Sequence, residues 1–215
     1  MNKLLIFLRY HIGQFSRKTF RNRLDQMRYR KYHGEKNISI ISQNCIGGVM
    51  SHDLGLRFNS PTINLYMEAE DYIRFLENLD YYLDIDANEL KFLDENLDYP
   101  VGILRDIKIY FVHYTTEKDV IEKWNKRRNR INRKALYVIM TDRDGCTPEI
   151  TARFLHLPYE KIFFSHEKET DTEIIYMPCF KKQLQVGSLT DFCSIFGKRY
   201  YNKYFDYVKW LANMH

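Results

Sequence analysis

The sequence predicts a single α/β domain with three α/β/α layers and a largely parallel or mixed sheet, preceded by a basic N-terminal helical arm. Short apolar runs that suit buried strands alternate with segments of helical period. The 215 residues can build one sizeable core, and 45% hydrophobic with 28% charged residues is typical of soluble proteins. No apolar run reaches the roughly 18 residues that span a bilayer. We expect the arm to cover residues 1–33 and the domain to cover residues 38–215.

Local patterns predict the first strand and helix of the domain. Residues 38–42 form a short run of mostly β-branched side chains, which suits a buried strand. Apolar residues then recur with helical spacing over residues 71–83, and acids gather near the start of this segment, where they suit the helix dipole. A strand, a polar turn at residues 43–48 and an amphipathic helix are therefore expected.

The middle of the chain predicts a hairpin followed by a helix. Residues 101–104 and 107–114 flank the turn Arg105-Asp106, and apolar side chains alternate along the second run. Thr116 with Asp119 then resembles the start of a capped helix, in which acids come early and bases late.

The C-terminal half predicts a strand, a loop and a helix, followed by two more strands. Residues 135–140 are a strand candidate, and the Thr-Pro-Glu tripeptide at 147–149 supplies an N-cap, a first-turn proline and an early acid. Residues 161–165 and 174–177 suit short strands, and the aromatic segment 189–211 is predicted to be helical, broken by its one glycine. Strands that alternate with helices imply a largely parallel sheet with both faces covered.

The positive charge is concentrated in the arm. Nine of the 33 Lys and Arg residues but one of the 28 acids precede Gly34, which leaves 24 bases and 27 acids, or −3, for the rest. Apolar residues in the arm recur with helical spacing, so we expect a basic amphipathic helix in one or two pieces. It either docks on an anionic membrane surface or packs on the domain with a solvated basic face. Nucleic acid is not expected as a partner, because the domain is not basic.

Two features bear on the compartment. The apolar run at residues 4–8 is shorter than the core of a secretory signal, which takes about 7 to 15 residues. We expect a cytoplasmic protein, peripheral to the inner face of the membrane if the arm docks there. The four cysteines lack paired CxxC spacing and are expected to be free thiols.

The loop after the first strand is one candidate site. In α/β sheets, ligands bind beyond the carboxyl ends of strands, near helix N-termini. Gly47 and Gly48 would let the backbone approach a phosphate or carboxylate, with Asn44 and Cys45 projecting from the turn. The alternative is that these glycines only form a tight turn.

The loop at residues 141–147 is the more informative candidate. Asp142 and Asp144 could share a divalent cation, Mn or Mg, that also binds a nucleotide diphosphate, with Arg143 and Thr147 contacting the substrate. The structural alternative is that Asp144 caps the following helix or pairs with an arginine.

A thiol nucleophile is a further hypothesis. Cys45 and Cys146 each stand near a predicted helix N-terminus, which can lower a thiol pKa. His113 and His166, near strand ends, are the candidate bases, although His113 shares its face with apolar residues and is more typical of a core histidine.

Six blocks together resemble the bacterial family called domain of unknown function 1919, whose members are described as exopolysaccharide or capsular polysaccharide biosynthesis proteins. The blocks span residues 38–166 and read ISIISQNCIGG, DYIRFLENLDYYL, YPVGILRDIKIYFVHY, EKWNKRRNRIN, LYVIMTDRDGCT and LPYEKIFFSH. The resemblance implies an α/β/α fold and a role in building bacterial surface polysaccharide, and it supplies no catalytic residue. Family members often carry an aromatic residue after the loop cysteine, where this chain has Ile46.

Three functions follow as expectations. The leading one is a transferase with a nucleotide-activated donor and a saccharide or lipid-linked acceptor, in which His166 or Asp144 assists proton transfer from an acceptor hydroxyl. The second is a thiol-dependent acyltransferase or hydrolase that acts on the polysaccharide through Cys45 or Cys146. The third is a non-catalytic, membrane-peripheral assembly factor.

Overall fold

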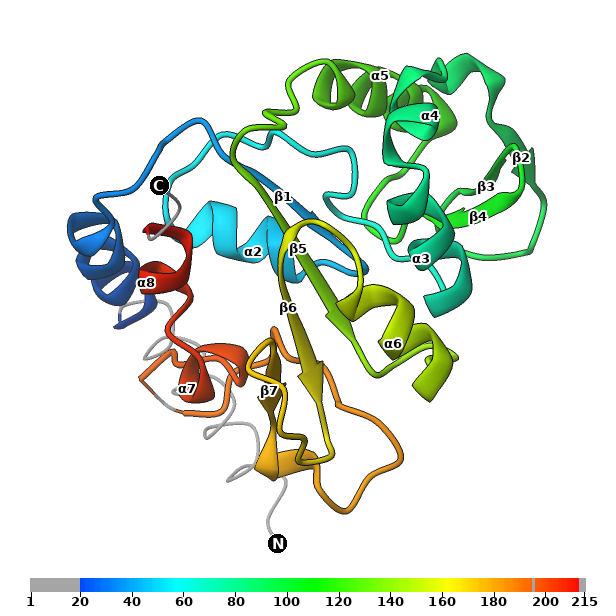
Figure 1. Ribbon diagram of the computed structural model, residues 1–215. Coiled ribbons are helices and arrows are strands. Elements are labelled where there is room, and N and C mark those ends of the chain that lie inside the picture. The colour runs from blue at the N-terminus through cyan, green and yellow to red at the C-terminus, as the bar shows by residue number, and fades with distance from the viewer. Residues whose placement is uncertain (1–19, 195, 213–215) are drawn as a thin grey trace, which may run out of the picture.

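A four-stranded parallel sheet forms the centre of the protein, as seen in a computed structural model that describes residues 20–194 and 196–212 (Figure 1). Its strands lie in the order β1-β5-β6-β7. Their bounds are β1 Ser39–Ser42, β5 Leu136–Thr141, β6 Glu160–Ser165 and β7 Ile174–Tyr176. All three pairings are parallel, so the carboxyl ends of the strands meet at one edge of the sheet.

Both faces of this sheet are covered, which gives the expected α/β/α layers. Successive strand residues point to opposite faces, so Val138 and Met140 enter one core whereas Tyr137 and Ile139 enter the other. The first core includes side chains of α3 (Ala69–Glu77), α4 (Leu79–Asp84), α5 (Glu117–Arg128) and α6 (Pro148–Leu155). The second includes those of α2 (Ile46–Asp53), α7 (Tyr201–Tyr204) and α8 (Tyr207–Ala212), and Figure 1 shows the two groups on opposite sides.

A small antiparallel sheet, of order β2-β3-β4, accompanies α3, α4 and α5. Its strands are β2 Lys91–Leu93, β3 Val101–Leu104 and β4 Ile107–Tyr110, and two short 3-10 helices are η1 Ala87–Glu89 and η2 Pro178–Phe180. The predicted hairpin is confirmed, with Arg105 at φ 60° in its turn. The predicted cap is confirmed too, because the Thr116 Oγ1 accepts a hydrogen bond from the Asp119 N–H at the start of α5.

Two helix predictions need correction. The helix expected over residues 71–83 is split into α3 and α4 at Asn78, whose φ of −123° and ψ of 38° are not helical. The helix expected over residues 189–211 is wrong for most of its length, since only α7 and α8 form there. Instead, Phe192 and Arg199 form an isolated antiparallel bridge around Gly197, which has φ 82°.

The described part of the arm packs on the domain. Residues 20–31 are helical, and Arg28 reaches the fully buried carboxylate of Asp53 at the end of α2, at 3.3 Å. The Tyr201 hydroxyl donates to the same carboxylate oxygen at 3.0 Å, which ties the helix to the C-terminal segment as well. Within the described residues, no helix is long and apolar enough to cross a membrane. The prediction for residues 1–19 lies outside the described residues.

Candidate functional site

The loops that follow β1, β5 and β6 converge at the carboxyl edge of the parallel sheet. Gln43, almost fully buried, joins the first two: its Oε1 accepts hydrogen bonds from the Thr141 N–H (3.1 Å) and Oγ1 (2.7 Å). Its Nε2 also donates to the Arg143 carbonyl at 3.3 Å. Because both ends of the Gln43 amide are used, the loop after β5 is held in a fixed position beside β1.

Asp142 and His166 form a hydrogen-bonded pair between the second and third loops. The Asp142 Oδ2 lies 2.5 Å from the His166 Nδ1, and the same oxygen accepts from the His166 N–H at 2.6 Å and the Ser165 Oγ at 3.2 Å. The two side chains are only 12% and 16% exposed. With its proton on Nδ1, the neutral ring donates to the ionised Asp142 carboxylate and carries its lone pair on Nε2, which lies 3.7 Å from the Glu167 Oε1.

The second oxygen of Asp142 holds a segment that sequence reasoning missed. The Val186 N–H donates to the Asp142 Oδ1 at 2.7 Å, and the neighbouring Gln185 Oε1 accepts from the Asp144 N–H at 3.2 Å. Segment 184–190 is thereby fixed against the loop after β5. It has no periodic pattern of its own in the sequence, so only the folded chain places it at this edge.

Asp144 combines a left-handed backbone with a partly buried carboxyl. Its φ is 57°, a left-handed conformation that costs most L-residues about 1 kcal/mol, and Gly145 follows with φ 82°. Burial raises the pKa of the Asp144 carboxyl, and Glu68 raises it further against the opposing effect of Arg143. The Asp144 carbonyl accepts from the Ala69 N–H at 2.8 Å, which ties the loop to α3.

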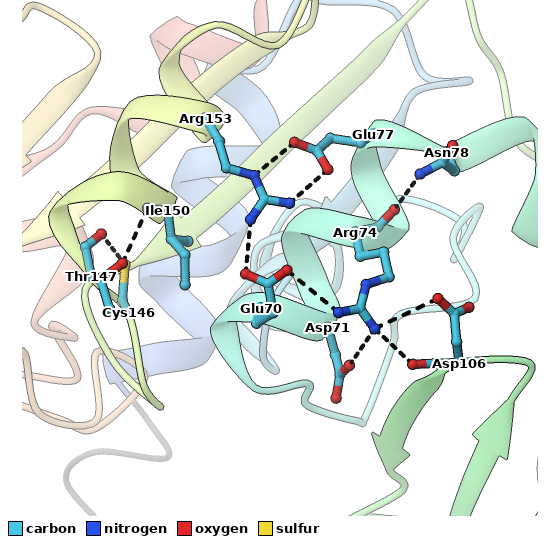
Figure 2. Close-up of polar contacts among 10 residues, drawn as sticks. All are labelled: Glu70, Asp71, Arg74, Glu77, Asn78, Asp106, Cys146, Thr147, Ile150 and Arg153. Carbon is cyan, nitrogen blue, oxygen red and sulfur yellow. Dashed lines mark hydrogen bonds and ion pairs between the residues drawn. The ribbon is translucent and has the colours of Figure 1, made fainter.

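Helix α6, which begins at the end of this loop, is clamped to α3. Figure 2 shows the Arg153 guanidinium between Glu70 and Glu77, with two bonds of 2.9 and 2.7 Å to Glu77 and one of 2.8 Å to Glu70. The hydrogen bonds that Glu77 accepts from Arg153 lower the pKa of the Glu77 carboxyl. The predicted cap of α6 is confirmed, since the Thr147 Oγ1 accepts from the Ile150 N–H at 3.3 Å.

Two cavities flank the 142–147 loop. The first has a volume of about 440 Å³ and the second about 550 Å³. The first is lined by Asn44, Cys45, Tyr66, His113, Arg143, Asp144 and Ser188, among others. The second is lined by Asp142, Cys146, Thr147, Thr151, His166 and Glu167, among others. The structure therefore divides the candidate residues between two neighbouring cavities.

The two candidate thiols are not set up as resting thiolates. Cys45 and His113 line the first cavity, while Cys146 and His166 line the second. Burial raises the pKa of Cys45 to about 11 and also raises that of Cys146. The expectation that helix N-termini lower these pKa values is not met, because desolvation of the thiolate is the larger effect.

Gly47 and Gly48 lie in the interior and line neither of the two cavities. A Cβ on Gly47 would lie 2.7 Å from the Ser42 Oγ, and one on Gly48 would lie 3.3 Å from the Ile63 side chain. The first N–H groups of α2 already donate within the protein: the Ile46 N–H donates to the Asn44 Oδ1, and the Gly47 N–H donates to the Ser42 Oγ. These glycines let α2 pack closely. They stand inside the helix, so the turn expected over residues 43–48 ends before Ile46 and the tight-turn alternative is also wrong.

The predicted Asp pair is a poor fit for a shared cation. The two carboxylate oxygens of Asp142 already accept four hydrogen bonds. Asp144 instead faces the first cavity beside Arg143, whose Nε lies 3.7 Å from the Asp144 Oδ1. Among residues 20–194 and 196–212, no three His, Cys, Asp or Glu side chains gather as a set that could hold a metal ion. The divalent cation stays a prediction from the sequence alone.

Comparison with known proteins assigns the family. The model of the domain of unknown function DUF1919 matches residues 15–212, nearly the whole chain. The chain belongs to this family. A similar protein is an uncharacterised protein of Haemophilus influenzae strain Rd, 41% identical over 177 residues, which cover 81% of this chain and 84% of the relative. The predicted DUF1919 resemblance is thereby confirmed.

Proposed function

We propose that this DUF1919 protein is a group transferase in which His166, oriented by Asp142, accepts the proton of an acceptor hydroxyl. The contact between the Asp142 Oδ2 and the His166 Nδ1 carries the proposal. It leaves Nε2 as the basic atom in a partly buried ring, and the ring lines the second cavity. A positioned histidine base contributes about 10²- to 10⁴-fold to such a step.

The chemistry needs only an activated donor and an alcohol. As the acceptor oxygen forms its bond to the electrophilic atom of the donor, its proton moves to the His166 Nε2. The bond from that atom to the leaving group breaks, and the leaving group takes the electron pair. The Asp142 carboxylate stabilises the imidazolium that forms, and the proton then passes to the leaving group or to water.

We place the leaving-group end of the donor in the first cavity, with its reacting atom extending past the 142–147 loop to the second cavity, which His166 lines. The buried Nε of Arg143 lies 3.7 Å from the Asp144 Oδ1 and has no hydrogen-bond partner among the described residues. The guanidinium lines the cavity and can meet an anionic leaving group such as a diphosphate beside that carboxylate. Tyr66 also lines this cavity, and its ring stacks on Tyr110 at 4.4 Å between centroids and 5° between planes. A base or sugar ring of a nucleotide-activated donor can extend that stack.

The setting in bacterial surface-polysaccharide biosynthesis rests on the sequence resemblance described above. A saccharide hydroxyl is an acceptor of the kind that a histidine base activates. We therefore propose a saccharide or lipid-linked saccharide as the acceptor and a nucleotide-activated compound as the donor.

The test is a panel of nucleotide-activated donors, first by thermal shift and then by mass-spectrometric detection of transfer to oligosaccharide acceptors. A donor at about 100 times its Kd stabilises the folded protein by roughly 2.7 kcal/mol, which raises the Tm by several degrees. The active donor is then tested with His166→Gln, which can keep a hydrogen bond to Asp142 but cannot act as a base. The matched control is His156→Gln, because His156 is exposed at the end of α6 and lines neither cavity.

The expected result is donor binding by all three proteins, with transfer lost about 10²- to 10⁴-fold in His166→Gln alone. Transfer at the wild-type rate in His166→Gln would overturn the role of His166. The absence of binding by every donor would overturn the transferase proposal itself.

A further inference from the structure

A groove separates the helix of residues 20–31 from the C-terminal helices α7 and α8. Its volume is about 710 Å³, and it lies apart from the candidate site, with which it shares no lining residue. Its lining comes from the helix of residues 20–31, from His33 just after it and from the segment 198–212.

The groove combines an apolar lining with accessible surface. Leu24 and Met27 come from the N-terminal helix, and Phe205 and Val208 face them from the C-terminal segment. Met27 remains 46% exposed, so part of its apolar side chain is accessible in the groove. The groove therefore offers contacts to the hydrocarbon part of a ligand.

The groove is also strongly basic. Lys31, Lys198, Lys203 and Lys209 are all exposed, and none of them forms an ion pair with a carboxylate in the described chain. The one acidic residue in the lining is Asp206, whose Oδ1 accepts the Lys209 N–H at 3.2 Å. Lys203 lies over the Tyr204 ring, 5.0 Å from its centroid, but no carboxylate of the described chain neutralises any of the four ammonium groups. They therefore attract an anion, and the apolar lining beside them attracts hydrocarbon.

We propose that this groove binds an anionic phospholipid at a membrane surface, with the lipid phosphate among the lysines and its first acyl methylenes against Met27 and Val208. A free phosphate would leave the apolar lining unused, and an uncharged lipid would leave the lysines unpaired. The surface joins the arm to the C-terminal segment, whereas the sequence pointed to the arm alone. It is independent of the chemistry proposed for His166.

The test is co-sedimentation of the full-length protein with vesicles of phosphatidylcholine alone and of phosphatidylcholine mixed with phosphatidylglycerol. The groove variant carries Lys198→Gln, Lys203→Gln and Lys209→Gln. The matched control carries Lys126→Gln, Lys134→Gln and Lys168→Gln, three exposed lysines elsewhere that also form no ion pair in the described chain. Both variants lose the same net charge, so they differ only in where that charge was.

A second pair of variants tests the apolar contact. Met27→Gln removes an apolar side chain from the groove, and Leu97→Gln removes one with the same 46% exposure from a loop outside it. Each lysine near an anionic surface strengthens partition about fivefold, so the triple groove variant should bind about a hundredfold more weakly. Met27→Gln should weaken partition about fivefold, and Leu97→Gln should leave it unchanged.

Binding that requires phosphatidylglycerol, and that falls in the groove variants but not in their controls, supports the proposal. Equal losses in the groove and control variants, or equal binding to both vesicle types, would overturn it. So would a loss confined to a variant in which Lys3, Arg9, Arg17 and Lys18 are changed to Gln, because the arm alone would then bind the membrane.

Discussion

Replacing Asp142 with Asn should both destabilise the protein and disorient His166. The carboxylate accepts three hydrogen bonds at Oδ2 and one at Oδ1, whereas an amide offers one oxygen. If that oxygen takes the Oδ2 position, the amide NH₂ meets the Val186 N–H, which is left unsatisfied at a cost of about 1 to 3 kcal/mol. The charge-assisted bond to His166 also weakens, so we expect a total loss of about 2 to 4 kcal/mol.

Urea unfolding followed by circular dichroism measures this loss as a free energy, and thermal unfolding measures it as a shift in Tm. In a domain of this size, each kcal/mol shifts the Tm by about 2 to 4 °C, so the variant should melt about 10 °C below the wild type. Asp171→Asn is the matched control, because Asp171 is exposed and its carboxylate accepts only the Glu173 N–H among the described residues. A Tm for Asp142→Asn within about 2 °C of the wild type would refute the role of Asp142 as a shared acceptor.

Three further outcomes are expected. Burial raises the pKa of Cys45 from 9.0 to about 11, so its thiolate fraction at pH 7.5 is about 100-fold below that of an unburied thiol, and iodoacetamide should label it correspondingly slowly; rapid labelling by peptide mapping would restore the thiol hypothesis. Burial raises the pKa of Asp144, so its ionised form destabilises the fold: Asp144→Asn should be more stable than the wild type at pH 7, and urea unfolding should show this gain vanishing near pH 3. The hydrogen bonds from Arg153 lower the pKa of Glu77, so this pair stabilises the protein above about pH 4.5 and stabilises it less as the pH falls. Arg153→Lys should lower the free energy of unfolding by about 0.5 to 1 kcal/mol at pH 7, and the difference from the wild type should narrow in acid.

The sequence could predict where the site lies but not how its residues pair. Thr147 is confirmed as a cap because the cap, the proline and the acid that follow are adjacent in the chain. Asp142 and His166 were each recognisable at strand ends, yet their bond depends on strand register. In the parallel pairing of β5 with β6, Thr141 lies opposite Phe164, which brings the residues just beyond them together.

The missed and mistaken parts depend on tertiary contacts. Val186 and Gln185 reach the site through a segment without periodic pattern, so no local rule could place them. The aromatic residues of the C-terminal segment imitate helical spacing, but Tyr201 and Tyr207 come from two separate short helices and pack edge to face in the second core, with ring centroids 5.4 Å apart. Packing also explains why residue 47 is a glycine, since a Cβ there would collide with Ser42, and sequence spacing does not reveal this contact.

The orientation of His166 can be measured without knowing the substrate. Nitrogen-15 NMR of the histidine rings, with His166 assigned by comparison with His166→Gln, reports which ring nitrogen carries the proton in the neutral form. Because the Asp142 carboxylate accepts from Nδ1, we expect the proton of the neutral ring on Nδ1 and the lone pair on Nε2. Asp142→Asn should shift this tautomer balance. A neutral ring with its proton on Nε2 in the wild-type protein would contradict the assignment of His166 as the base.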